Sequence, residues 1–86
     1  MIFGALSDKD YSTMLEILAP ISREVLLVPV RSERAAAPEI LASACRVPHR
    51  IFAHAREALE ASHGKTLITG SLFLVGEVLE LLGSEP

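Results

Sequence analysis

Residues 66–78 read TLITGSLFLVGEV, and this stretch decides the fold. Thr66 to Thr69 form a short apolar run that favours a β-strand, and Gly70 interrupts it. From Ser71 onward, apolar side chains recur at positions 72, 75, 78, 79 and 82, which is helical spacing. The stretch therefore predicts a strand, a tight turn and a helix that opens with a serine.

Such a turn places backbone N–H groups and the Ser71 hydroxyl at the carboxyl end of a strand. The N-terminus of a helix carries unpaired N–H donors and a partial positive charge, so it attracts anions. In open α/β sheets, ligands bind at this end of the strands. Ser71 is therefore a candidate for binding a carboxylate or a phosphate, although an ordinary helix N-cap is the commoner use of serine at such a position.

The rest of the chain continues the alternation of strands and helices. The expected strands cover residues 1–4, 24–30, 51–52 and 66–69, and the expected helices cover residues 8–19, 38–44, 53–62 and 71–82. Alternation of this kind predicts an α/β fold with a mostly parallel sheet of about three or four strands, right-handed crossovers and helices on both faces.

Details of the helices follow from capping and periodicity. Ser7 is the expected N-cap of the first helix, with Asp10 completing a loose capping box. Gly64, after His63, is the expected left-handed cap of the third helix. The expected inward faces are Tyr11, Met14, Leu15 and Leu18 in the first helix, Ile40, Leu41 and Ala44 in the second, and Ala55, Ala58, Leu59 and Ser62 in the third.

Composition limits the classes of function. The 86 residues suffice for one small domain, and half of them are hydrophobic, which is typical of a globular protein. The formal net charge of −3 and the dispersed basic residues argue against a nucleic-acid surface. The single cysteine, Cys45, excludes an internal disulfide and suits a reducing compartment. We see no signal peptide and no run of about 18 apolar residues, so we expect a cytoplasmic protein with no membrane partner.

Several other residues are candidates for a binding site. Lys9 follows the first strand and lies beside a helix start, where a cation is electrostatically disfavoured, so it could hold an anionic ligand. A solvated lysine between Asp8 and Asp10 is the alternative. Arg31 and Arg34 could grip an anion or lie in a solvated loop. Cys45, His49 and His54 match no common zinc spacing, so no metal ligands are assigned.

Patterns for phosphate cradling and nucleophilic catalysis are absent from the sequence. There is no Walker A pattern and no G-x-G-x-x-G, and residues 69–73 lack the second glycine of a G-x-S-x-G elbow. We therefore assign no catalytic residue and no cofactor to this chain.

Two segments in order go beyond a generic α/β pattern. Residues 3–11, FGALSDKDY, and residues 68–78, ITGSLFLVGEV, resemble the C-terminal domain of folylpolyglutamate synthases and dihydrofolate synthases, members of the Mur ligase superfamily. Two further segments resemble the same domain. They are residues 25–30, VLLVPV, and the expected helix start at Pro38-Glu39. The likeness covers nearly the whole chain and implies a Rossmann-like three-layer sandwich.

The resemblance also implies a chemistry. Enzymes of this family use ATP and magnesium to convert a folate carboxylate to an acyl phosphate, which the amino group of glutamate attacks. Lys9 matches the lysine of the family's D-K-D motif, and Ser71 matches the serine of its T-G-S-L motif. The resemblance therefore implies that Lys9 and Ser71 bind the incoming glutamate and help position it.

Other parts of the family pattern are missing from this sequence. The P-loop domain is absent, as is the D-G-A-H-N segment expected one β-α unit before Met1. We expect a single Mur ligase C-terminal-type domain over residues 1–86, inactive alone, whose partners are the missing P-loop domain, glutamate and folate. The alternative is a stand-alone, non-enzymatic binding or dimerisation module that pairs with a second copy through an exposed sheet edge.

Overall fold

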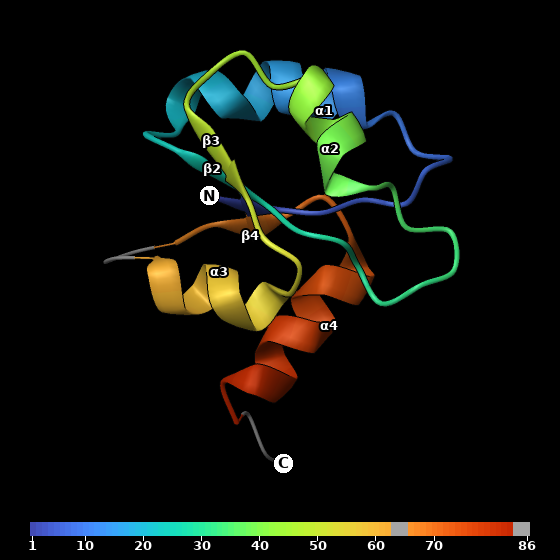
Figure 1. Ribbon diagram of the computed structural model, residues 1–86, viewed down its shortest axis with the longest axis vertical. Coiled ribbons are helices and arrows are strands. Elements are labelled where there is room, and N and C mark those ends of the chain that lie inside the picture. The colour runs from blue at the N-terminus through green and yellow to red at the C-terminus, as the bar shows by residue number, and fades with distance from the viewer. Residues whose placement is uncertain (63–65, 84–86) are drawn as a thin grey trace.

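The computed structural model describes residues 1–62 and 66–83 and contains one four-stranded sheet (Figure 1). The strands are β1 (Ile2–Phe3), β2 (Val25–Leu27), β3 (His49–Ile51) and β4 (Ile68–Thr69). They lie in the order β3-β2-β1-β4, and every pairing is parallel. The predicted α/β class and parallel sheet are confirmed.

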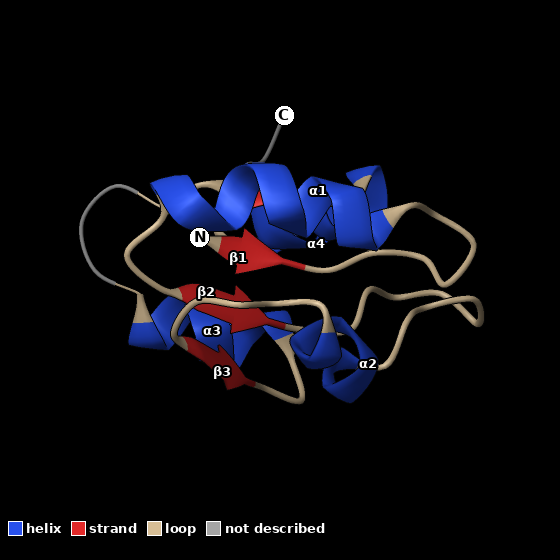
Figure 2. Ribbon diagram, turned by 90° about the horizontal axis from the view of Figure 1, so that it is seen from above, coloured by secondary structure: helices blue, strands red, loops and turns tan. Residues whose placement is uncertain are grey.

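Helices cover both faces of this sheet, as expected. They are α1 (Tyr11–Leu18), α2 (Pro38–Ser43), α3 (Ala55–Ala61) and α4 (Leu72–Leu81), with a short 3-10 helix, η1 (Ala19–Ile21), after α1. Figure 1 shows α1 and α2 above the sheet and α3 and α4 below it. Figure 2 shows the arrows of β1, β2 and β3 pointing the same way. The connection from β1 to α1 and the connection from β2 to α2 both begin at the tips of these arrows.

The core consists of two apolar clusters, one on each face. Phe3, Leu15, Leu27 and Leu41 belong to the cluster under α1 and α2. Ile2, Leu26, Val28, Ala58, Leu74 and Val78 belong to the cluster under α3 and α4. Alternate residues of β1 and β2 point to opposite clusters, which explains why all residues of both strands are buried and why their sequence is continuously apolar.

The start of α1 differs from the expectation. Asp10, not Ser7, is the N-cap, and its carboxylate accepts a hydrogen bond from the Thr13 N–H at 3.2 Å. Residues 7–9 instead form a turn, in which the Lys9 N–H donates to the Leu6 carbonyl at 3.2 Å. Pro20 lies in η1, so the helix does change type where the proline predicted a stop.

The inward faces agree with the periodicity only in part. In α1 the predicted face is confirmed, because Leu15 is buried and Tyr11 and Met14 pack against the same cluster, with Leu18 partly buried. Ile40 is 51% exposed in α2. Among the side chains of α4 whose burial is described, Leu74 and Val78 are buried, whereas Leu79 and the following Leu82 are 48% and 65% exposed. The helix is apolar on nearly every side, so its apolar spacing did not identify which side faces the sheet.

The faces of α2 and α3 and the start of the third strand can also be compared with the predictions. Leu41 is buried in α2, and Ala55 and Ala58 are buried in α3 with Leu59 and Ser62 partly buried, as expected. The third strand begins at His49, two residues before the predicted start. The expected cap at His63–Gly64 lies outside the described residues. None of the described helices has the length and apolar character needed to cross a membrane.

The sheet order places a topological switch point between β1 and β4. The chain leaves β1 toward α1 on one face, while it leaves the neighbouring β4 toward α4 on the other face (Figure 1). Neighbouring strands whose following helices lie on opposite faces define the topological switch point of an open α/β sheet, where ligands bind. This general rule points to the carboxyl ends of β1 and β4 as the place to look for a ligand.

Candidate functional site

Lys9 lies on the connection from β1 to α1, directly before the N-cap of the helix. The residue is exposed. Within residues 1–62 and 66–83, no acidic side chain forms an ion pair with its ammonium group. Lys9 is therefore an accessible cation near the carboxyl end of β1, and it is not sealed in the interior.

The two aspartates beside Lys9 are engaged with other groups. Asp8 Oδ2 accepts a hydrogen bond from Arg34 Nη1 at 3.0 Å. Asp10 caps α1 through the Thr13 N–H. The expectation that these aspartates cap the helix holds for Asp10, while Asp8 pairs with an arginine from another loop. Neither carboxylate forms the ion pair that would hold the Lys9 ammonium in place.

Ser71 lies between β4 and α4, directly before the first residue of the helix. It is partly buried, and its carbonyl accepts the Val75 N–H at 3.1 Å. This position, at the mouth of a ten-residue helix, is the one that residues 66–78 predicted. Ser71 and Lys9 thus follow the carboxyl ends of two neighbouring strands, on the same rim of the sheet.

Two glycines bring the backbones together at this rim. Gly70 has a φ of +103°, and a Cβ atom there would collide with the Gly4 carbonyl oxygen. A Cβ atom on Gly4 would lie 2.6 Å from the Val28 carbonyl oxygen. Gly4 and Gly70 directly follow β1 and β4. The close packing that they permit holds the two turns of the switch point against each other.

Arg31 and Arg34 were the two candidate arginines for binding an anion. Both form ion pairs with carboxylates of the chain. Arg34 pairs with Asp8, and Arg31 bridges two residues of α4. Arg31 Nε lies 3.2 Å from Glu77 Oε2, and Arg31 Nη1 lies 2.9 Å from Glu80 Oε2. The sequence reasoning missed Glu77 and Glu80, although a spacing of three residues places both on neighbouring turns of one helix.

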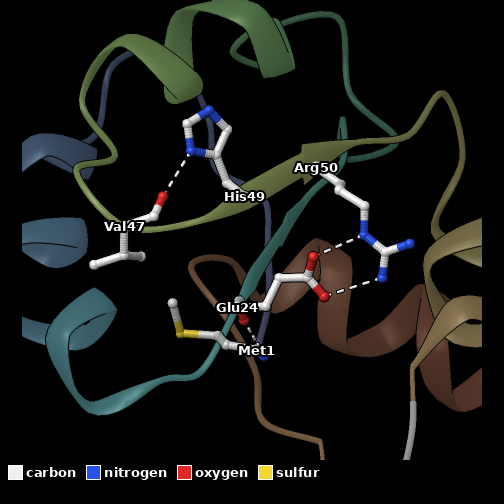
Figure 3. Close-up of polar contacts among 5 residues, drawn as sticks. All are labelled: Met1, Glu24, Val47, His49 and Arg50. Carbon is white, nitrogen blue, oxygen red and sulfur yellow. Dashed lines mark hydrogen bonds and ion pairs between the residues drawn. The ribbon is translucent and has the colours of Figure 1, made fainter.

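Cys45, His49 and His54 do not come together as a metal site. Cys45 follows α2 in the chain and is buried in the cluster that contains Phe3 and Leu41. The Nδ1 atom of His49, in β3, lies 2.8 Å from the Val47 carbonyl oxygen (Figure 3). His54 is the N-cap of α3 in a capping box with Glu57. The described residues contain no group of three or more His, Cys, Asp or Glu side chains placed to hold a metal ion.

The opposite rim carries a cavity of about 500 Å³. Its lining includes Met1, Ile21, Ser22, Glu24 and Leu67. Beside it, Arg50 forms a two-point ion pair with Glu24, at 2.8 and 3.0 Å, and the amino group of Met1 donates to the Glu24 carbonyl (Figure 3). This hollow lies at the amino ends of the strands, away from the switch point.

Comparison with known proteins gives one match among solved structures. The crystal structure of folylpolyglutamate synthase from Thermotoga maritima matches with a TM-score of 0.84 and 30% sequence identity, over 96% of this chain. This chain spans 20% of the length of that synthase. No family model and no curated protein sequence matches the chain. The resemblance and the fold inferred from the sequence are confirmed by this structural match.

Proposed function

Because the chain shares its fold with a segment of folylpolyglutamate synthase, we propose that it is the glutamate-positioning part of a ligase of that type. The proposed parent enzyme joins glutamate to a folate carboxylate through an acyl phosphate. In this proposal the segment corresponds to the C-terminal domain, and the remainder of the ligase supplies the nucleotide, magnesium and folate sites. A cytoplasmic location is part of the same proposal.

The position of Lys9 and Ser71 is the observation that carries the proposal. Both follow the carboxyl ends of neighbouring strands at the switch point. The Lys9 ammonium would pair with a carboxylate of the incoming glutamate. The Ser71 hydroxyl and the first N–H groups of α4 would donate hydrogen bonds to it, since a helix N-terminus favours an anion.

Positioning is the contribution that this site makes to the reaction. Holding the glutamate amino group in place converts a bimolecular attack on the acyl phosphate into an effectively intramolecular one. Lys9 and Ser71 move no proton and form no covalent bond in this scheme. The described residues offer no metal-ligating cluster, so no step is assigned to a metal held by this chain.

A hybrid enzyme tests the proposal. The matched fifth of the Thermotoga synthase is replaced by this chain, and glutamate-dependent ATP turnover is measured. Lys9→Ala should raise the KM for glutamate by about tenfold to a hundredfold, the effect of losing a hydrogen bond to a charged group. Arg50→Gln, on the opposite rim, is the control and should leave the KM unchanged. A Lys9→Ala hybrid with an unaltered KM would remove Lys9 from the site.

Association of two copies through a sheet edge is the second candidate, and one feature favours it. The sheet ends on β3 at one side and β4 at the other. Ile51 in β3 is 43% exposed, and Leu67 beside β4 is 50% exposed. Open strand edges with exposed apolar side chains promote pairing between chains. Light scattering over a concentration series tests this candidate, which predicts dimers; a monomer at every concentration would contradict it.

A further inference from the structure

The connection from β2 to α2, residues 28–37, contacts both elements that carry the proposed glutamate ligands. We propose that this connection is a clamp that fixes the Lys9 turn relative to α4, with Arg34 and Arg31 as positioning residues. The inference rests on the proposed function of Lys9 and Ser71. It assigns to the two arginines an indirect part in glutamate binding, exerted through the backbone that they hold.

Arg34 holds the turn that carries Lys9. Its side chain pairs with Asp8 at 3.0 Å, and its carbonyl accepts the Ser7 N–H at 2.6 Å. Immediately beside these contacts, Leu6 and Ala35 form an antiparallel bridge, and the Ala36 N–H donates to the Ala5 carbonyl at 2.9 Å. The turn before α1 is therefore attached to the connection by backbone hydrogen bonds on one side and by an ion pair at its tip.

Arg31 holds α4. The Glu77 side chain is only 9% exposed, and its Oε2 atom lies 3.2 Å from Arg31 Nε. The second oxygen, Oε1, is buried without a hydrogen-bond partner among the described residues. Loss of Arg31 would leave this mostly buried carboxylate without its cation, which is costly, so α4 would shift to hydrate it. The pair therefore fixes the helix that begins after Ser71.

The two attachments lie above a closely packed group of residues. The space where a Cβ atom of Gly4 would lie is bounded by the Val28 carbonyl, by Val30 and by Leu74 of α4, at 2.6, 3.2 and 3.4 Å. Strand β1, the start of the connection and α4 are thus in close contact beneath the rim. Movement of the connection would be transmitted to both the Lys9 turn and the start of α4.

The two arginines differ from Lys9 in their ion-pair partners. Arg31 and Arg34 already have carboxylate partners, whereas the described residues provide none for Lys9. At either arginine an arriving dicarboxylate would meet a charge that a carboxylate of the chain already neutralises, whereas at Lys9 it would meet an ammonium group with no such partner among the described residues. Their role is therefore to hold the turn and the helix, while Lys9 remains accessible to the ligand.

The test uses the full chain labelled with ¹⁵N. Binding of L-glutamate is measured by NMR titration, and backbone order at residues 7–10 is measured by heteronuclear NOE. Arg34→Gln should weaken binding about threefold to fivefold, the range expected for an exposed ion pair. Arg31→Gln should weaken it by at least as much, because the mostly buried Glu77 carboxylate loses its cation. Arg34→Gln should also lower the order of residues 7–10. Arg34→Lys, which keeps the charge, should restore most of both properties.

Further variants show whether an effect of Arg34→Gln is specific to the clamp and acts through Lys9. Arg50→Gln removes an arginine with its own ion pair on the opposite rim, and it should change neither binding nor order. In a Lys9→Ala background, Arg34→Gln should weaken binding no further, because its effect acts through Lys9. If Arg34→Gln fails to fold, Asp8→Asn breaks the same pair from the other side.

Failure of the clamp can be told apart from failure of the proposed function. Normal affinity and normal order in both Arg34→Gln and Arg31→Gln, with weakened binding in Lys9→Ala, would overturn the clamp alone. Unchanged binding in Lys9→Ala, or no glutamate binding by the unsubstituted chain, would overturn the proposed function. The NOE measurement would then still decide whether Arg34 orders the turn.

Discussion

Gly70 makes the turn between β4 and α4 possible at the level of a single residue. Its φ of +103° lies in the region that favours glycine, and the adjacent Gly4 carbonyl leaves no room for a Cβ atom. The sequence placed a turn here, because a glycine separates a β-favouring run from a helical one. It could not reveal the close approach to Gly4, which is 66 positions away and depends on the pairing of β1 with β4.

Gly70→Ala should therefore destabilise the protein by at least about 2 kcal/mol, through backbone strain and the collision with Gly4. Urea unfolding followed by circular dichroism measures this change. Gly76→Ala is the matched control, since Gly76 is in the middle of α4 with open space around it. That variant should be stabilised by about 0.5–1 kcal/mol. Equal effects of the two substitutions would contradict the geometry of the turn.

The candidate site was partly predictable at this scale. Lys9 and Ser71 follow strands in the sequence, so their location on one rim could be inferred once a parallel sheet was expected. The partners of Arg31 and Arg34 could not, since Asp8 and Glu77 are distant in sequence and no local pattern links them to the arginines. Contacts between loops depend on the order of the strands, which periodicity does not specify.

Helix starts and helix faces were the least predictable features at the scale of secondary-structure elements. Strand and helix order followed from the alternation of short apolar runs with longer periodic ones. Ser7 and Asp10 are both good capping residues, so the sequence alone could not choose between them. In α4 nearly all positions are apolar, and its buried side became visible only through packing on the sheet.

Asp10→Ala should destabilise the protein by about 1 kcal/mol, because α1 loses the side chain that accepts the Thr13 N–H. Ser7→Ala is the control, since Ser7 is exposed and lies outside the helix. It should change the free energy of unfolding by less than about 0.5 kcal/mol. A larger loss from Ser7→Ala than from Asp10→Ala, in thermal or urea unfolding, would restore the serine as the cap.

The orientation of α4 has a similar test. Leu74→Ala should cost about 2–5 kcal/mol, because Leu74 is fully buried against the sheet. Leu79 is on the same helix and is 48% exposed, so Leu79→Ala should cost less than about 1 kcal/mol. The two free energies of unfolding are compared in urea. The reverse ranking would mean that α4 is rotated relative to its described position.

This chain spans a fifth of the length of the synthase that it matches. Its strand order, β3-β2-β1-β4, places the topological switch point between β1 and β4, and the two candidate glutamate ligands, Lys9 and Ser71, follow these strands in the chain. A cavity at the opposite rim provides an internal comparison, since it is larger than a single side chain and carries its own charged residues. The central claim is that glutamate binds at the first of these places.

A map of amide chemical-shift changes on adding L-glutamate to the ¹⁵N-labelled chain tests this claim most directly. Binding at the switch point predicts saturable shifts in residues 4–11 and 70–75, which follow β1 and β4, and no saturable shifts around Ser22, Glu24 and Leu67. Shifts centred on those amino-rim residues, or an undisturbed Lys9 turn at saturating glutamate, would contradict it.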